Sequence, residues 1–121
     1  MSESEILDTH LQELRRGTIV VASLTVLRTP GYGYSLLATL SAAGFEVEAN
    51  TLYPLLRRLE AQGLLTSSWD TSEPRPRKFY KTTEQGDAIT ETLRSEWARL
   101  DRAIADLGTE TPATATPGSE K

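Results

Sequence analysis

Apolar residues recur at helical spacing along most of the 121-residue chain, so the pattern predicts a largely helical fold. A first helix is expected over residues 5–16, with Gly17 as its end and Thr18 as the cap of the next element. Residues 19–28 are apolar on nearly all sides. Their β-branched residues would suit a strand, but their length favours a buried helix. The stripe of the first helix consists of Ile6, Leu7, His10, Leu11 and Leu14.

A turn at residues 29–31 separates this region from a helix predicted over residues 33–43. In that helix Leu36, Leu37 and Leu40 are expected to point inward. Gly44 suits the position just after its last turn, where a left-handed backbone is common.

The sharpest pattern lies in residues 50–62, where four leucines recur at i, i+3, i+4 and i+7. This spacing predicts a helix with one buried side. Asn50 or Thr51 is expected to cap its start, which would put Pro54 in or beside the first turn, and Gly63 ends it. The four leucines are Leu52, Leu55, Leu56 and Leu59.

Two strand-like runs follow, over residues 64–70 and 77–82. The polar connection between them contains two prolines, so the segment is predicted to form a β-hairpin with a rigid tip. Trp69 lies on the first strand and is expected to pack in the core.

A long helix is predicted to begin at Thr82 or Thr83 and to reach about Leu107, with Gly108 as its end. The run from Thr82 to Gln85 has the form of a capping box. The helix is longer than one small domain needs, and its apolar residues follow a heptad rhythm that suits either its own domain or a second helix. These residues are Leu93, Trp97, Leu100, Ile104 and Leu107.

The pattern divides the chain into three parts. Residues 1–82 form a first domain that includes the N-terminal helix, and residues 83–108 form the long C-terminal helix. Residues 109–121 contain no large apolar side chain and are predicted to be a disordered tail.

The net charge of −4 hides a basic segment. Residues 51–82 carry six basic and three acidic groups, whereas the segments before and after them are acidic. Because salt screens charges beyond about 8–10 Å, the local balance decides which surface meets a polyanion. The alternative is that this segment is an ordinary solvated surface.

Composition excludes several kinds of chemistry. The chain has no cysteine and a single histidine, His10, so disulfides, thiol catalysis and multi-histidine metal centres are excluded. No apolar run is long enough to span a membrane, and no phosphate-binding glycine motif is present. We therefore expect a cytoplasmic protein that is not an enzyme, requires no cofactor and does not bind a membrane.

The order of elements predicts a mainly α fold with a β-hairpin wing, namely a winged helix-turn-helix followed by a long helix. In such folds the second helix of the pair enters the major groove of DNA, and the wing contacts the backbone. Asn50, Pro54, Arg57 and Ala61 would point away from the leucine stripe, and Asn and Arg are suited to reading base edges. The residues predicted to contact DNA are Tyr34, Asn50, Thr51, Tyr53, Arg57, Arg58, Arg75, Arg77 and Lys78.

Several short motifs match one family in order and spacing. They are Tyr-Gly-Tyr at 32–34, Thr-Leu-Tyr-Pro-Leu-Leu-Arg-Arg-Leu-Glu at 51–60, Gly-Leu-Leu at 63–65, Pro-Arg-Lys-Phe-Tyr at 76–80 and Thr-Glu-Gln-Gly at 83–86. Over about residues 14–95 the chain resembles the PadR family of transcriptional regulators. Two departures are Pro30, where members often have histidine, and Thr82, where leucine is common.

The resemblance implies a homodimer that binds double-stranded operator DNA, usually as a repressor, with Tyr53 as a key DNA contact and the C-terminal helix as the dimerisation element. The short helix resembles a smaller branch, in some members of which planar aromatic compounds stack on a tryptophan between the subunits. Trp97 is therefore expected either in the dimer core or in an effector pocket. The alternative function is a winged-helix module that binds protein without specific DNA binding.

Overall fold

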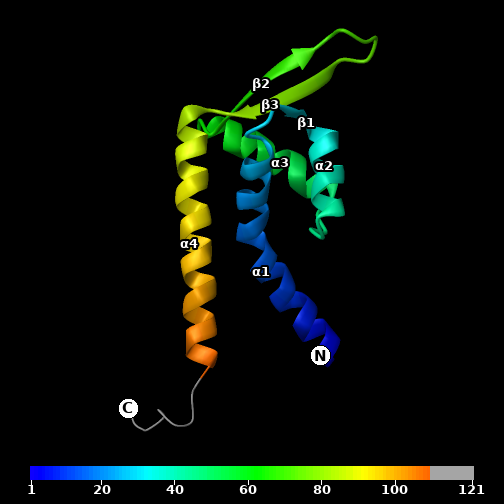
Figure 1. Ribbon diagram of the computed structural model, residues 1–121. Coiled ribbons are helices and arrows are strands. Elements are labelled where there is room, and N and C mark those ends of the chain that lie inside the picture. The colour runs from blue at the N-terminus through cyan, green and yellow to red at the C-terminus, as the bar shows by residue number, and fades with distance from the viewer. Residues whose placement is uncertain (110–121) are drawn as a thin grey trace. The chain divides into compact units, whose positions relative to one another are not determined.

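The computed structural model describes residues 1–109. Within this range the chain forms four α-helices and one three-stranded antiparallel sheet (Figure 1). The predicted fold class, a winged helix-turn-helix with a long C-terminal helix, is confirmed. Residues 110–121, most of the predicted disordered tail, lie outside the described residues. The elements are α1 (Glu3–Val26), β1 (Gly31–Tyr32), α2 (Gly33–Ala42), α3 (Ala49–Ala61), β2 (Leu65–Asp70), β3 (Arg77–Thr82) and α4 (Glu84–Gly108).

The chain divides into two compact units, Met1–Thr90 and Glu91–Lys121. The first unit contains α1, α2, α3, the sheet and the first turns of α4. The described part of the second unit is the remainder of α4.

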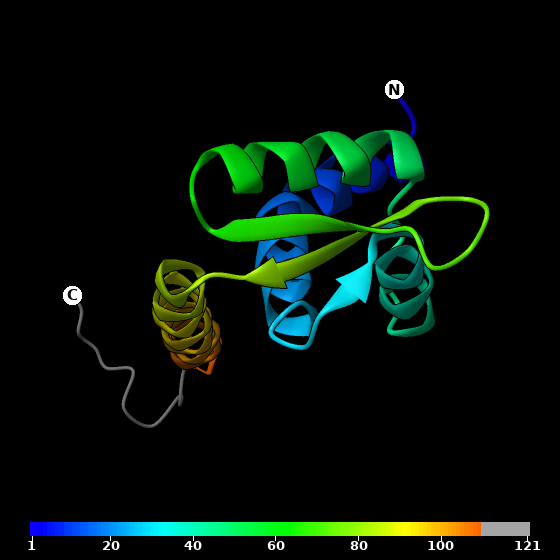
Figure 2. The same cartoon turned by 90° about the horizontal axis from the view of Figure 1, so that it is seen from above.

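Leucines from three helices and the sheet build the core of the first unit. The predicted stripe of α3 is buried in full, and α3 packs against β2 along the hairpin (Figure 2). Burying one such side chain contributes about 1.5–3 kcal/mol, so this stripe anchors α3 and leaves its other side in solvent. The buried apolar side chains are Ile19, Leu24, Leu27, Leu36, Leu40, Leu52, Leu55, Leu56, Leu59, Leu64, Leu65 and Tyr80.

The N-terminal region is one helix, not the two predicted over residues 5–16 and 19–28. Ser2 caps α1 in a capping box with Glu5, and the helix continues through Gly17 without a break. A single glycine costs a helix only about 1 kcal/mol, which its neighbours offset here. The Thr18 hydroxyl donates to the carbonyl of Arg15 within the helix and caps nothing.

The start of α3 also differs from the prediction. Its N-cap is Glu48, with no side-chain capping bond, so neither Asn50 nor Thr51 caps the helix. Pro54 consequently lies in the second turn, where its missing N–H leaves the carbonyl of Asn50 without its usual helical partner. Both residues are exposed, so water can satisfy this carbonyl.

Two glycines end their helices as predicted. Gly44 and Gly63 have φ values of 100° and 81°, in the left-handed region that glycine adopts at no steric cost. The N–H groups of Phe45 and Leu64 reach back to Leu40 and Leu59, which forms a Schellman motif after α2 and after α3.

The predicted turn at residues 29–31 contributes a third strand that the pattern missed. Gly31 pairs with Tyr80, and Tyr32 pairs with Phe79, so β3 lies between β1 and β2. Two residues are too short to show an alternating pattern. The strand nevertheless places Tyr32 beside the wing.

The cap of α4 is Thr83 rather than Thr82. The Thr83 hydroxyl accepts the N–H of Gly86 at 2.9 Å and donates to the carbonyl of Gly63 at 2.7 Å. Thr82 is buried and donates to Asp87 instead. The predicted capping box from Thr82 to Gln85 is therefore wrong, and the capping residue lies one position later.

Candidate nucleic-acid interface

The exposed side of α3 carries the polar residues expected there. Asn50, Thr51, Arg57 and Arg58 are all exposed, opposite the buried leucines. Neither arginine forms an ion pair with a carboxylate within residues 1–109. Both guanidinium groups are therefore available to an external anion.

Tyr53 is half-buried and its ring lies against the start of α2. A Cβ atom on Gly33 would come within 2.8 Å of the Tyr53 ring, so only glycine allows this close approach. The ring therefore lies beside the start of α2, close to Tyr80 of the sheet.

Arg77 lies at the centre of a charged and aromatic network on the wing. Its Nη2 atom is 3.3 Å from a Glu73 oxygen and 3.8 Å from an Asp70 oxygen. Its Nη1 atom donates to the Tyr34 hydroxyl at 2.8 Å, and its guanidinium lies 4.3 Å from the centre of the Tyr32 ring. These contacts connect the wing to β1 and to the start of α2.

The carboxylate of Asp70 is the fixed point of this network. It accepts hydrogen bonds from the Tyr32 hydroxyl and from the backbone and hydroxyl of Ser72. Led by the bond from Tyr32, these donors lower the pKa of Asp70 from 3.8 to about 2. The same bond is the main reason that the pKa of Tyr32 is raised.

Arg77 keeps its charge in this setting. Its burial acts to lower its pKa, but the charge of Glu73 and the nearby tyrosine oxygens raise that pKa above its ordinary value. Its Nε atom is buried and has no hydrogen-bond partner.

A second ion pair connects the wing with α3. Lys78 lies 3.7 Å from Glu60, which also accepts a hydrogen bond of 2.6 Å from Ser67. The ammonium lies 5.8 Å from the centre of the Trp69 ring. Lys78 is thus partly neutralised, whereas Arg75 at the wing tip is exposed and has no ion pair within the described residues.

Trp69 corrects the expectation that it packs in the core, because 63% of its surface is exposed. A helix covers only part of a hairpin, and a side chain beyond the end of that helix can point into solvent. The length of a strand in the sequence does not reveal where the covering helix ends. Trp69 borders an open cleft of about 270 Å³ between α2, α3 and the wing. The cleft is lined by Gly33, Tyr34, Tyr53, Trp69, Arg77, Lys78 and Tyr80.

The structure therefore brings together Tyr34, Tyr53, Arg77 and Lys78, which the sequence placed on separate elements. Sequence reasoning missed Trp69 and the acidic residues that hold the basic ones. The alternation of β2 and β3 could have placed Asp70, Arg77 and Tyr32 on one face, given the register. That register was not known from the pattern.

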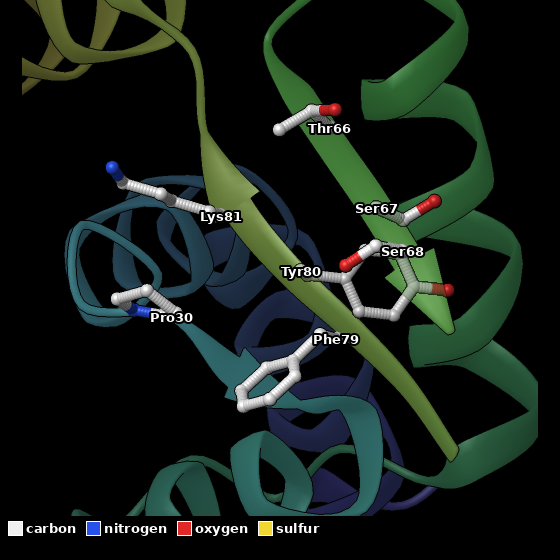
Figure 3. Close-up of a pocket in the computed structure, with 7 residues that line it drawn as sticks. All are labelled: Pro30, Thr66, Ser67, Ser68, Phe79, Tyr80 and Lys81. Carbon is white, nitrogen blue, oxygen red and sulfur yellow. The ribbon is translucent and has the colours of Figure 1, made fainter. Parts of the chain in front are cut away.

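A second hollow, of about 260 Å³, is bordered by Pro30, Phe79 and Lys81. Figure 3 draws the side chains that line it. Tyr80 and the residues Thr66, Ser67 and Ser68 of β2 complete its border. None of the residues predicted to contact DNA lines it.

The predicted dimerisation stripe of α4 is largely uncovered. Trp97, Leu100, Ile104 and Leu107 are exposed, and Leu93 is half-buried. Ile104 exposes 68% of its surface, and it is the alignment of several such residues on one side of the helix that is typical of an interaction surface.

Residues 1–109 hold no group of three or more acidic or histidine side chains placed to bind a metal ion. None of the helices in this range is long and apolar enough to cross a membrane.

Comparison with known proteins identifies the family. The sequence model of the transcriptional regulator PadR-like family matches residues 23–92 of this chain. This range contains α2, α3 and the wing. The chain belongs to this family. PadR-like proteins are transcriptional regulators and not enzymes, in agreement with the resemblance seen in the motifs.

Proteins similar to this PadR-like chain are also named as transcriptional regulators or transcription factors. The chain is 43% identical over 65 residues to a transcriptional regulator of Mycobacterium tuberculosis named Rv3488, a match that covers 53% of this chain and 61% of that relative. A PadR family regulator from Eggerthella lenta DSM 2243 has a solved structure with a TM-score of 0.82 and 44% identity, covering 88% of this chain and 96% of the other. A PadR-like transcription factor from Bacteroides fragilis gives a TM-score of 0.70 at 29% identity, covering 83% and 99%.

Proposed function

We propose that this PadR-like protein is a homodimeric repressor that binds operator DNA through α3 and the wing. The observation that carries the proposal is the exposed side of α3, where Arg57 and Arg58 pair with no carboxylate of the described part of the chain. A leucine-anchored helix with this outer side suits the major groove. A regulator of this kind acts on chromosomal DNA, so the proposal includes a cytoplasmic location.

Roles follow from the placement of each side chain. Asn50, Arg57 and Arg58 are suited to base edges, because amide and guanidinium groups form paired hydrogen bonds there. The hydroxyls of Tyr34, Thr51 and Tyr53 are suited to phosphates, as is exposed Arg75. Lys78 and Arg77 would contact the backbone once one acidic partner of each has moved away.

The test measures binding of the full chain to the DNA that flanks its gene, and to a random duplex of equal length. Arg57→Ala is expected to weaken operator binding about 5- to 150-fold, because one base contact contributes about 1–3 kcal/mol. Arg102→Ala, an exposed arginine on α4, is the matched control and should change little. Equal affinity of the wild type for both duplexes, with no salt dependence, would favour the protein-binding alternative.

We propose further that α4 forms the dimer contact and that Trp97 borders a site for a planar aromatic effector. The support is the exposed apolar stripe, on which Trp97 exposes 52% of its surface. Titration with flat aromatic compounds should quench the fluorescence of Trp97 and weaken operator binding. Trp97→Phe separates this signal from that of Trp69, and a series without either effect would leave Trp97 as dimer core alone.

A further inference from the structure

Arg77 differs from the other arginines of the proposed interface because the free protein already supplies it with anions. Only 25% of its side chain is exposed, and both of its nearby carboxylates approach the same nitrogen, Nη2. Within residues 1–109, Arg57, Arg58 and Arg75 have no such partner. A role for Arg77 in DNA binding, which rests on the proposed function, must therefore include the displacement of a carboxylate.

The two carboxylates are not held equally. Asp70 is fixed by Tyr32 and Ser72, its side chain is mostly buried, and its oxygen is the more distant one at 3.8 Å. Glu73 lies closer, at 3.3 Å, but 60% of its side chain is exposed, and it is held by its ion pair with Arg77. Glu73 is thus the partner that can leave without disturbing the network.

Glu73 also lies where DNA would bring a competing anion. It belongs to the tip of the β2–β3 hairpin, which projects beyond the helices of its unit in Figure 1. A phosphate that approaches the wing would repel the Glu73 carboxylate. The oxygen atoms of the same phosphate can accept hydrogen bonds from the guanidinium, as the carboxylate of Glu73 does in the free protein.

We propose that Arg77 is a site for a DNA backbone phosphate that Glu73 occupies in the free protein. The phosphate replaces Glu73 at Nη2, while Tyr34 and Asp70 keep the guanidinium in place. The wing then contacts DNA with its charge restored, and Glu73 lowers the affinity for every sequence because it competes for the same cation.

The test is a double-mutant cycle on the full chain, with Glu73→Gln, Arg77→Gln and the double variant. Binding is measured to the flanking duplex and to a random duplex at several salt concentrations. Glu73→Gln should tighten binding to both duplexes about three- to tenfold when Arg77 is present. In the Arg77→Gln background, the same change should have an effect below about 1.5-fold.

The matched control is Glu13→Gln on α1. Glu13 lies 3.2 Å from Arg16, so this change removes the same charge from a comparable ion pair outside the wing. It should leave affinity within about 1.5-fold of the wild type.

Three results would overturn the proposal. The first is equal tightening by Glu73→Gln in both backgrounds, which would indicate general repulsion. The others are an unchanged affinity and a weaker affinity of Glu73→Gln. If Arg77→Gln lowers the melting temperature, Arg77→Lys replaces it. Lysine keeps the charge without the planar fork, so competition predicts a smaller effect of Glu73 and general repulsion predicts an equal one. Absence of any DNA binding by the wild type would instead contradict the proposed function.

Discussion

Whether an arginine can bind an external anion depends on the carboxylates around it as much as on its charge. Arg57 and Arg77 carry the same group, but among residues 1–109 the first pairs with no carboxylate, whereas the second faces Asp70 and Glu73. Exposed ion pairs contribute only about 0–1 kcal/mol, so a partner such as Glu73 is displaced at little cost. The interface thus combines cations that are free from the start with cations that must change partners.

The lowered pKa of Asp70 makes the free energy of unfolding depend on pH in the acid range. Its pKa is about 2 in the folded chain and near 3.8 when unperturbed. A lowered pKa contributes stability that is fully present above the unfolded value and is lost as the pH falls toward the folded one. We therefore expect Asp70→Asn to destabilise the fold at pH 5 and above, and the difference from wild type to shrink between about pH 4 and 2.

Denaturant unfolding of both proteins from pH 6 to 2 checks this, since the difference between them removes the contribution of other carboxylates. A carbon-13 titration of the Asp70 carboxyl group gives the pKa directly. A difference that stays constant over the whole range, or a carboxyl that titrates near pH 4, would contradict the role assigned to Tyr32.

Among the elements, α3 and the hairpin were predictable because their signals are local. The leucine spacing of α3 and the glycines after α2 and α3 determine where those helices lie and end. The two strands of the wing follow from their alternation, and the structure places them within one residue of the prediction.

Other features depend on contacts that no local pattern contains. Strand β1 exists because Gly31 and Tyr32 meet Tyr80 and Phe79, about 48 residues away. The ion pairs of Arg77 and Lys78 depend on the register of the hairpin and on its packing against α3. The sequence could thus predict which residues contact DNA from their chemical type. It could not predict which of them are already paired with a carboxylate in the free protein.

Two glycines in helices illustrate this limit and make a paired prediction. Gly17 was expected to end a helix, but it lies inside α1 with nothing within 4 Å of a Cβ atom. Gly86 lies in the first turn of α4, where a Cβ would come 2.0 Å from the carbonyl oxygen of Leu64. Gly17→Ala should raise the free energy of unfolding by about 0.5–1 kcal/mol, and Gly86→Ala should lower it by roughly 3 kcal/mol.

Thermal and denaturant unfolding of the two variants measure these changes, and each variant serves as the control for the other because both add one methyl group to a helix. A destabilised Gly17→Ala would indicate that α1 is interrupted at this residue. An unchanged Gly86→Ala would indicate that α4 does not lie so close to the carbonyl group of Leu64.

At the scale of the whole molecule, charge and apolar surface are separated along the chain. The basic segment, residues 51–82, lies within the first unit, and the chain has an acidic net charge of −4. The second unit presents the exposed apolar stripe of α4. A protein that presents one surface to DNA and another to a second copy of itself would need this separation. The acidic segments outside residues 51–82 limit non-specific contact with nucleic acid, because they repel its phosphates.

The stripe leads to a prediction about assembly. Ile104→Asp places a carboxylate on it, and burying this charge between two helices costs several kcal/mol per chain. Because Ile104 is already exposed in the single chain, the helix itself should persist, and the helical signal in circular dichroism should remain. Sedimentation equilibrium should show monomers at concentrations where the wild type is a dimer, with operator binding weakened because two half-sites need two recognition helices. Ser95→Asp adds the same group to the opposite side of α4 and should remain dimeric. A dimer of unchanged affinity in Ile104→Asp would show that α4 is not the dimer contact.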